Sequence, residues 1–321
     1  MNKTLHRQKK DKHDEYYTLY ETIENELAYY DVKYFKNKIV YCNCDNPYES
    51  NFFKYFVINF NRLGLKKLIC SCYNGQPGIG EQMTLFDDSF SLNEKALKIE
   101  INVVDDSCIK NPTVENVLRL KDNRLIELKG NGSFDSPECI ETLKESDIVV
   151  SNPPFSLFRR YIYIINKYKK DFIVLGTLAA ISYKDIYTMF MCNKIYVGAT
   201  INGDSINFLC NNKLKNVNVV WYTTIKSSVN KPRLQSIMLY EPKNYFKYNN
   251  YDAIHIDKIK YIPYNYKGVM GVPITFICKY DWSKDYEIIK FRRGDDNKDL
   301  NYTDGKGNKI CPYIRILIKH K

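Results

Sequence analysis

Several features that would place a chain in a membrane or outside the cell are missing from this sequence. No apolar run among its 321 residues is long enough to span a bilayer, so we expect no membrane segment. Residues 1–12 are polar and basic, and they lack the apolar stretch of a secretory signal. The ten cysteines are therefore expected to be free thiols in a reducing cytoplasm.

Metal-binding and phosphate-binding patterns are also lacking. The chain has four histidines, and no Cys/His set has the spacing of zinc ligands. Two Cys-x-Cys pairs lie in apolar, strand-like segments, where cysteine is a common small core residue: Cys42/Cys44 and Cys70/Cys72. The glycine cluster at residues 75–80 is not followed by the Lys-Ser/Thr pair of a phosphate-binding loop. We therefore predict no metal site, and a surface turn at the glycine cluster.

Positive charge is in excess. Lysine and arginine number 48 against 37 acidic residues, which gives a formal net charge of +11. Basic side chains bind phosphates and release counterions, so this excess favours a polyanionic partner such as nucleic acid. A generally lysine-rich proteome would give the same excess, and charge alone does not decide. Residues 1–13 are basic enough to form an arm along a phosphate backbone, or equally a solubilising tail.

The most informative stretch is residues 147–155, where a strand-like run leads into Asn-Pro-Pro-Phe. The β-branched residues of the run are typical of a strand buried in a parallel sheet. Pro153 and Pro154 end the strand and lack backbone donors. The Asn152 amide oxygen and the Pro153 carbonyl then remain as neutral acceptors, with the ring of Phe155 beside them.

These groups suit a planar amino group that is conjugated to a ring. The lone pair of such a nitrogen is delocalised, so the nitrogen is a poor nucleophile. Two acceptors that take its two hydrogens draw it toward tetrahedral geometry and free the lone pair to attack a methyl sulfonium. Flipped bases are held by such hydrogen bonds and by stacking. The alternative is a strand stopped by proline, in which Asn152 merely caps the following helix.

Strand-like and helix-like segments alternate along the chain. They predict an α/β fold with an open, mostly parallel sheet and helices on both faces. In such a sheet a small ligand binds beyond the carboxyl ends of the strands. Ser136 before Pro137 is a typical helix start. We expect strands at residues 38–42, 65–72, 98–104, 147–150, 171–176 and 194–197, helices at 50–63, 156–169 and 183–190, and part of a hairpin at 121–129.

The Asn-Pro-Pro-Phe stretch resembles the catalytic motif of S-adenosylmethionine-dependent amino-methyltransferases, and the wider sequence resembles the EcoRI-type adenine-specific DNA methyltransferases. The similarity reaches nearly end to end, with a weak part at about 73–130. It is carried by residues 14–18, 41–47, 50–56, 151–158, 268–276 and 315–318. The resemblance implies a Rossmann-like methyltransferase sheet whose catalytic residues are Asn152, Pro153, Pro154 and Phe155.

The resemblance also implies S-adenosyl-L-methionine as the cofactor. Family members cover its methionine end with the segment matching residues 14–18, and an acid next to Phe contacts its adenine amine. Here Asp45-Asn46-Pro47 stands in place of a glycine-rich turn, and Asp135 follows Phe134 while Ser133 precedes it. Residues 14–18 and Asp135 could instead cap helices. The candidate cofactor contacts are Asp14, Tyr17, Thr18, Asp45, Pro47, Ser133, Phe134 and Asp135.

The domain organisation is expected to follow function. We predict a basic arm at residues 1–13, a catalytic domain at 14–200 and a target-recognition region at 201–321, which is rich in tyrosine and lysine. The implied activity is N6-methylation of a flipped adenine in double-stranded DNA, by the modification enzyme of a restriction–modification system. The sequence leaves open whether a cognate restriction endonuclease accompanies it. An RNA adenine methyltransferase, a protein glutamine methyltransferase and a non-catalytic DNA-binding relative remain alternatives. The sequence leaves the oligomeric state open.

Overall fold

The chain divides into two compact units. The computed structural model describes residues 18–73, 96–201, 203, 205–210 and 213–321. The first unit comprises Met1–Ala180 and Met189–Ser228, and the second comprises Ile181–Thr188 and Val229–Lys321. The strands at residues 205–210 and 213–223 belong to the sheet of the first unit, so this compact unit extends beyond residue 200. The boundary predicted there between a catalytic and a target-recognition region stays a prediction.

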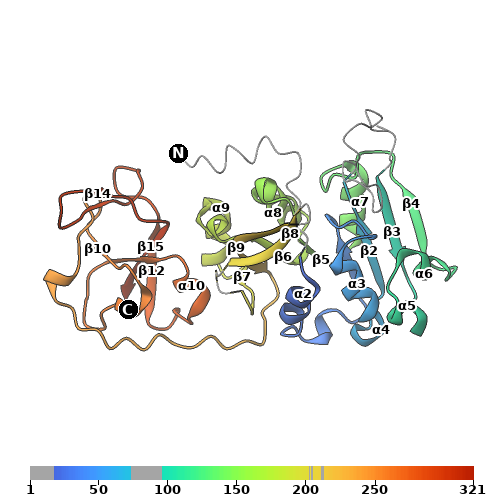
Figure 1. Ribbon diagram of the computed structural model, residues 1–321, viewed down its shortest axis with the longest axis horizontal. Coiled ribbons are helices and arrows are strands. Elements are labelled where there is room, and N and C mark those ends of the chain that lie inside the picture. The colour runs from blue at the N-terminus through green and yellow to red at the C-terminus, as the bar shows by residue number, and fades with distance from the viewer. Residues whose placement is uncertain (1–17, 74–95, 202, 204, 211–212) are drawn as a thin grey trace. The chain divides into compact units, whose positions relative to one another are not determined.

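The described strands of the first unit form one sheet in the order β4-β3-β2-β1-β5-β6-β9-β7, with β8 paired to β9. Its centre is parallel and consists of β1 (Ile39–Cys42), β2 (Lys67–Ser71), β5 (Ile148–Ser151) and β6 (Asp171–Thr177). Antiparallel strands flank this centre: β3 (Leu97–Ile101), β4 (Arg124–Glu127), β7 (Tyr196–Val197), β8 (Ser205–Cys210) and β9 (Lys213–Thr223). The predicted Rossmann-like α/β fold is confirmed (Figure 1).

Side chains alternate between the two faces of the sheet along each buried strand. Both faces therefore have to be covered, and helices pack on each. On one face Val40 packs in a core cluster with Phe52 and Phe56. On the other face the rings of Phe158 and Tyr222 lie 4.9 Å apart. The first face carries α2 (Tyr20–Leu27), α3 (Asn51–Ile58) and α4 (Phe60–Leu63), and the second carries α7 (Pro137–Glu145) and α8 (Phe158–Lys167) (Figure 1).

Local sequence accounts for most helix boundaries. The hydroxyl of Ser136 caps α7 by accepting from the amide of Cys139, as the Ser-Pro pair predicted. The helix predicted at 50–63 is interrupted at Asn59, which separates α3 from α4. The strand within 121–129 pairs with β3, but two short helices join them in place of a hairpin turn: α5 (Asp106–Lys110) and α6 (Val114–Leu118).

The order of the strands creates a switch point between β1 and β5. From β1 the chain moves outward through β2 and β3, and it later returns to place β5 and β6 on the other side of β1. The connections after β1 and β5 therefore leave the sheet in opposite directions and open a crevice between them. Ligands bind in such crevices in open α/β sheets.

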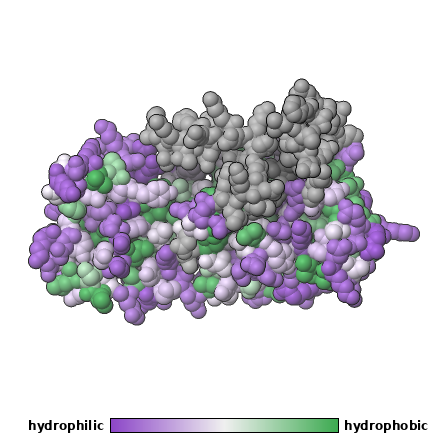
Figure 2. Space-filling model, viewed as in Figure 1, coloured by the Kyte–Doolittle hydropathy of each residue, from purple (hydrophilic) through white to green (hydrophobic). Residues whose placement is uncertain are grey.

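The second unit is built around a small sheet in the order β10-β11-β15-β12. Tyr248, Leu300 and Leu317 belong to its core. The described residues visible in Figure 2 are mostly hydrophilic, with hydrophobic residues in small separate patches. No helix in the described ranges is long and apolar enough to cross a bilayer. The elements of this unit are η4 (Pro242–Asn244), β10 (Ile254–His255), η5 (Ile259–Tyr261), β11 (Met270–Pro273), α10 (Phe276–Lys279), β12 (Tyr286–Phe291), β13 (Tyr302–Thr303), β14 (Lys309–Ile310) and β15 (Arg315–His320), while α9 (Lys184–Met191) spans the division of the units.

Candidate active site

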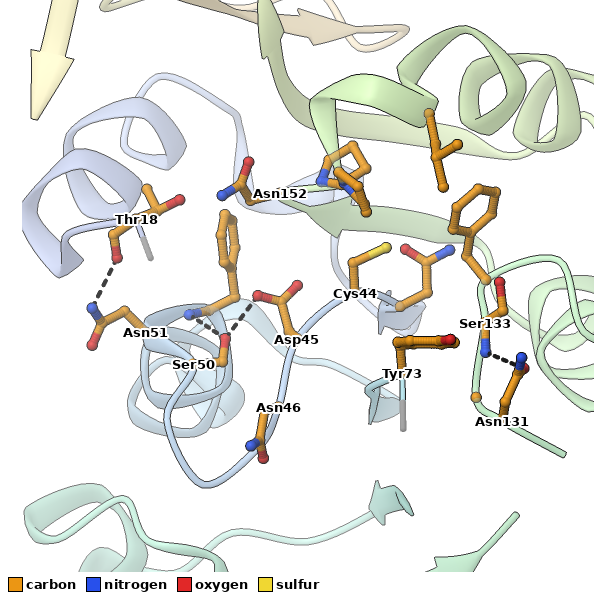
Figure 3. A pocket seen from close by; sticks show the side chains of 17 residues that line it. Thr18, Cys44, Asp45, Asn46, Ser50, Asn51, Tyr73, Asn131, Ser133 and Asn152 are labelled. Atoms are coloured by element: carbon orange, nitrogen blue, oxygen red, sulfur yellow. Dashed lines mark hydrogen bonds between the residues drawn. The ribbon is translucent and has the colours of Figure 1, made fainter. Parts of the chain in front are cut away.

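A cavity of about 440 Å³ lies at the switch point, beyond the carboxyl ends of β1 and β5. It is lined by residues that follow these strands and by the segment before α7. In the view of Figure 3, Thr18 and Asn152 lie toward one end of the cavity, Asp45 lies near the middle, and Ser133 lies toward the other end. The lining includes seven residues expected from the sequence: Thr18, Asp45, Ser133, Phe134, Asn152, Pro153 and Pro154.

Asp45 connects three parts of the cavity wall. One carboxylate oxygen, Oδ1, accepts from the hydroxyl of Ser50 at 2.9 Å, and the other, Oδ2, accepts from the hydroxyl of Ser151 at 2.6 Å. Ser50 is also the N-cap of α3, since its Oγ accepts from the amides of Phe52 and Phe53. Ser151 is the last residue of β5 and accepts from the amide of Cys44 at 3.2 Å. The loop after β1 is thus bonded both to α3 and to the residue before Asn152.

The Asn-Pro-Pro segment forms part of the same wall. Asn152 is half-buried and Pro153 is buried, and both line the cavity with Pro154. The prolines end β5, and the chain then turns through a short 3-10 helix, η2 (Phe155–Leu157), into α8. Phe155 does not line the cavity. Its ring packs edge-on against that of Phe208, with 6.0 Å between the centroids.

The far end of the cavity is formed around Phe134. Its ring lies 5.1 Å from that of Tyr161, and the Tyr161 hydroxyl donates to Asn43 Oδ1 at 2.5 Å. Burial raises the pKa of Tyr161 well above its ordinary value, so this hydroxyl stays protonated. Gly132 has φ +70°, and a Cβ there would lie 2.1 Å from the carbonyl oxygen of Cys72. A glycine is required where these two segments meet.

Two of the predicted cofactor contacts do not line the cavity, and two more cannot be placed. Asp135 does not line the cavity, because its carboxylate accepts from the Ser133 hydroxyl at 2.5 Å and forms an ion pair with Arg160. Pro47 follows the lining residues of the β1 loop but is not one of them. The remaining two, Asp14 and Tyr17, lie outside the described residues.

The polar groups of the cavity wall suit a ligand that carries cationic and hydrogen-bonding groups. The hydroxyl oxygen of Thr18 is buried, and it has no hydrogen-bond partner among the residues that the structure describes. The backbone carbonyl of Thr18 is held by the Asn51 amide at 2.8 Å. A carboxylate, that of Asp45, lines the middle of the cavity. The methionine end of S-adenosylmethionine, with its ammonium and sulfonium charges, would complement these groups.

Sequence reasoning missed several lining residues. Asn43 and Cys44 directly follow the first strand and Ser50 directly precedes α3, so their position in a strand-to-helix loop was the available signal. Tyr73 and Asn131 also line the cavity, but they lie in the region of weak resemblance or next to its end. Nothing in their local sequence distinguishes them from ordinary loop residues.

Comparison with known proteins gives one consistent family. A family model described as adenine-specific methyltransferase EcoRI matches residues 4–321. The Type II methyltransferase M.EcoRI of Escherichia coli is 41% identical, over 100% of this chain and 97% of that protein. M.MgeORF184P of Mycoplasma genitalium is 37% identical and M.MpnI of Mycoplasma pneumoniae is 34% identical, each over 89% of this chain, and over 85% and 84% of those proteins. A solved structure of a putative RNA methyltransferase from Pyrococcus horikoshii shows only a weak likeness, with 13% identity, a TM-score of 0.33, and coverage of 68% of this chain and 89% of that one.

Proposed function

This chain belongs to the EcoRI family of adenine-specific methyltransferases, and we propose that it methylates N6 of an adenine in duplex DNA, with S-adenosyl-L-methionine as the methyl donor. One observation supports the proposal above the others. Asn152 and Pro153, whose acceptors suit an aromatic amino group, line the same cavity as Thr18 and Asp45, which suit the cofactor. The acceptor of the methyl group and its donor would therefore meet in one crevice.

The residues have separable roles in this proposal. Asn152 Oδ1 and the Pro153 carbonyl would accept the two hydrogens of N6 and so free its lone pair. Thr18 and Asp45 would hold the polar end of the cofactor, and Phe134 would lie toward its adenine. When bound, S-adenosylmethionine supplies the electrophilic methyl group. Asp45 would also hold the loop after β1 against the end of β5, since it accepts from Ser151 directly before Asn152.

Phe155 is not given a stacking role in this proposal. Its ring packs against Phe208 on the side of the main core of the first unit. Stacking on a flipped base, as the residue pattern predicted, would require the ring to leave this contact. The side chain is therefore proposed to anchor the Asn-Pro-Pro segment.

The test is transfer of labelled methyl groups to duplex DNA, with RNA and a protein extract as parallel substrates. We expect label in N6-methyladenine after digestion of the DNA. Label confined to RNA or protein would overturn the assignment of the substrate. Absence of cofactor binding would favour a non-catalytic relative.

Asn152→Ala is the matched test of the mechanism. We expect turnover to fall about 100-fold or more, as for the loss of one polar group at a reacting centre, while the cofactor is still bound. Asn166→Ala, an exposed position on α8, is the control and should retain full turnover. Retained turnover in Asn152→Ala would contradict the proposed activation of N6.

The biological setting is also proposed. The relatives are named Type II methyltransferases, which supports a restriction–modification system with an endonuclease that cuts the same sequence. We also propose that the protein works in a reducing cytoplasm, where the nine cysteines whose side chains the structure describes would stay free thiols. DNA from cells that express the protein should resist cleavage by that endonuclease, and cleavage at unchanged rates would argue against this setting.

A further inference from the structure

A second cavity, of about 390 Å³, lies within the second unit and shares no lining residue with the candidate active site. Its walls come from the segment around η4, from β10 and the residues after it, from η5 and from β13. Small-molecule sites have volumes of about 300–1,000 Å³. The cavity is therefore large enough to hold a ligand.

Three nearly parallel rings line this cavity. Tyr302 is stacked on His255 with 4.3 Å between centroids and 20° between planes, and on Phe246 with 5.2 Å and 18°. His255 is buried, and burial lowers its pKa to about 4, so the imidazole is neutral near pH 7. Phe246 is 43% exposed. A neutral stack that ends in an exposed ring favours a flat aromatic ligand over an aliphatic one.

Two polar side chains lie beside the rings. Asp257 and Asn244 both line the cavity and are exposed to solvent. Their oxygens can accept hydrogen bonds from an exocyclic amino group of a planar ligand. A purely apolar occupant would leave these acceptors without a function.

Lysines are sequence neighbours of several residues that line the cavity. Lys243, Lys247, Lys258 and Lys260 each directly precede or follow a lining residue, and all four are exposed. Lys243 pairs with Glu241 at 3.2 Å, whereas no ion pair of the other three is seen within the described ranges. Exposed lysines that flank the lining residues of an aromatic cavity suit a base that is part of a phosphate chain.

Building on the nucleic-acid substrate proposed above, we propose that this cavity binds one unpaired nucleobase that carries an exocyclic amino group. The base stacks on the exposed face of Phe246 at the end of the stack, Asp257 or Asn244 accepts from its amino group, and the lysines contact the flanking phosphates. This site is separate from the one that would hold the target adenine. It gives the second unit a way to bind a displaced or single-stranded nucleotide.

The test uses a short single-stranded DNA that contains one 2-aminopurine, whose fluorescence falls when it stacks on aromatic rings. We expect quenching on binding to the full-length protein, and a fully paired duplex without the methylation target should show none. Phe246→Ala should weaken binding of the single strand by about 5-fold to 100-fold. Tyr264→Ala is the control, because Tyr264 is exposed in the same unit and does not line the cavity.

Two further measurements distinguish a failure of this site from a failure of the proposed methyltransferase activity. Methyl transfer to duplex DNA is measured on the same samples, and thermal unfolding shows whether each variant is folded. Quenching that depends on Phe246 supports the base site even in a protein that fails to methylate DNA. Unchanged binding by Phe246→Ala, or equal losses in Phe246→Ala and Tyr264→Ala, would overturn it whatever the methyl transfer shows. Free deoxyadenosine monophosphate that bound as tightly as the oligonucleotide, without dependence on salt, would overturn the role of the lysines.

Discussion

The carboxylate of Asp45 and the hydroxyl of Ser151 are joined by a hydrogen bond of 2.6 Å between residues 106 positions apart in sequence. Asp45 lies in the loop after β1, and Ser151 is the last residue of β5, directly before Asn152. Because both oxygens of Asp45 accept from serine hydroxyls, movement of this loop is transmitted to the Asn-Pro-Pro segment. We regard Ser50 and Ser151 as positioning residues for both ligands of the site.

Ser151→Ala should weaken cofactor binding roughly tenfold, since a hydrogen bond to a charged group contributes about 1.5–3 kcal/mol and its loss frees Asp45 to shift. Turnover should fall as well, because Asn152 follows directly. Calorimetric titration with the cofactor measures the first effect. Ser156→Ala, an exposed position in η2, is the control. Equal affinities of the two variants would show that Ser151 does not position the site.

Thr18→Val should weaken cofactor binding without changing the free energy of unfolding. The Thr18 hydroxyl has no hydrogen-bond partner within the described ranges, so its replacement by a methyl group should leave the free energy of unfolding within about 0.5 kcal/mol. The dissociation constant of the cofactor should rise about 2-fold to 10-fold, the value of one hydrogen bond. Thr22→Val, in the following helix and away from the cavity, should change neither quantity. An unaltered dissociation constant in Thr18→Val would remove this residue from the site.

Glu26→Ala should destabilise the first unit strongly. The carboxylate of Glu26 is fully buried and accepts from the Tyr30 hydroxyl, the amides of Ala199 and Thr200, and the Thr200 hydroxyl, at 2.7–2.8 Å. Its removal leaves buried donors without an acceptor, and the free energy of unfolding should fall by about 3 kcal/mol or more. Glu24→Ala, on the exposed side of α2, should change it by less than about 0.5 kcal/mol in the same denaturant titration. A small effect at Glu26 would mean that water replaces the carboxylate.

Stability of the second unit should depend on His255 in mildly acidic solution. Its pKa is lowered from 6.5 to about 4, first by burial and then by the charge of Arg315, while Asp257 acts in the opposite direction. Between these pH values the unfolded chain binds a proton that the folded chain does not. The contribution of the neutral His255 to the free energy of unfolding is therefore complete above pH 6.5. It is lost as the pH falls toward 4, by up to about 3 kcal/mol.

The measurement for His255 is the difference in denaturant midpoint between pH 7 and pH 5, in the parent protein and in His255→Gln. Glutamine does not titrate in this range, so the variant should lose less stability than the parent on acidification. Subtracting one difference from the other removes the effect of the other titrating groups, because both proteins contain them. Identical losses in both proteins would show that the imidazole stays exposed to protons in the folded state.

Local patterns were sufficient to predict the central elements of the fold. The β-branched run before two prolines identified β5 and its turn, and Ser136 before Pro137 identified the start of α7. These features depend on neighbours in sequence, through proline geometry and side-chain capping. The same patterns placed Asn152 at the carboxyl end of a parallel strand, where it lines the cavity.

Long-range relationships were beyond local patterns. The bond between Asp45 and Ser151 depends on the register of β1 against β5, which aligns Val40 with Ile148. The ion pair with Arg160 directs Asp135 away from the expected contact, and the partner comes from the helix after β5. The pairing of β9 with β6 was likewise not predictable, because it has no signature in either strand alone.

The bond between Asp45 and Ser151 also has a consequence for the order of folding. During synthesis the loop after β1 leaves the ribosome about a hundred residues before Ser151 does, and contacts of such separation form late. Until β5 has inserted beside β1, the loop holds one half of a ligand site and lacks the other. A nascent chain should therefore gain affinity for the cofactor in one step, when β5 docks. Ligand capture by stalled chains of increasing length would time the closure of the parallel sheet.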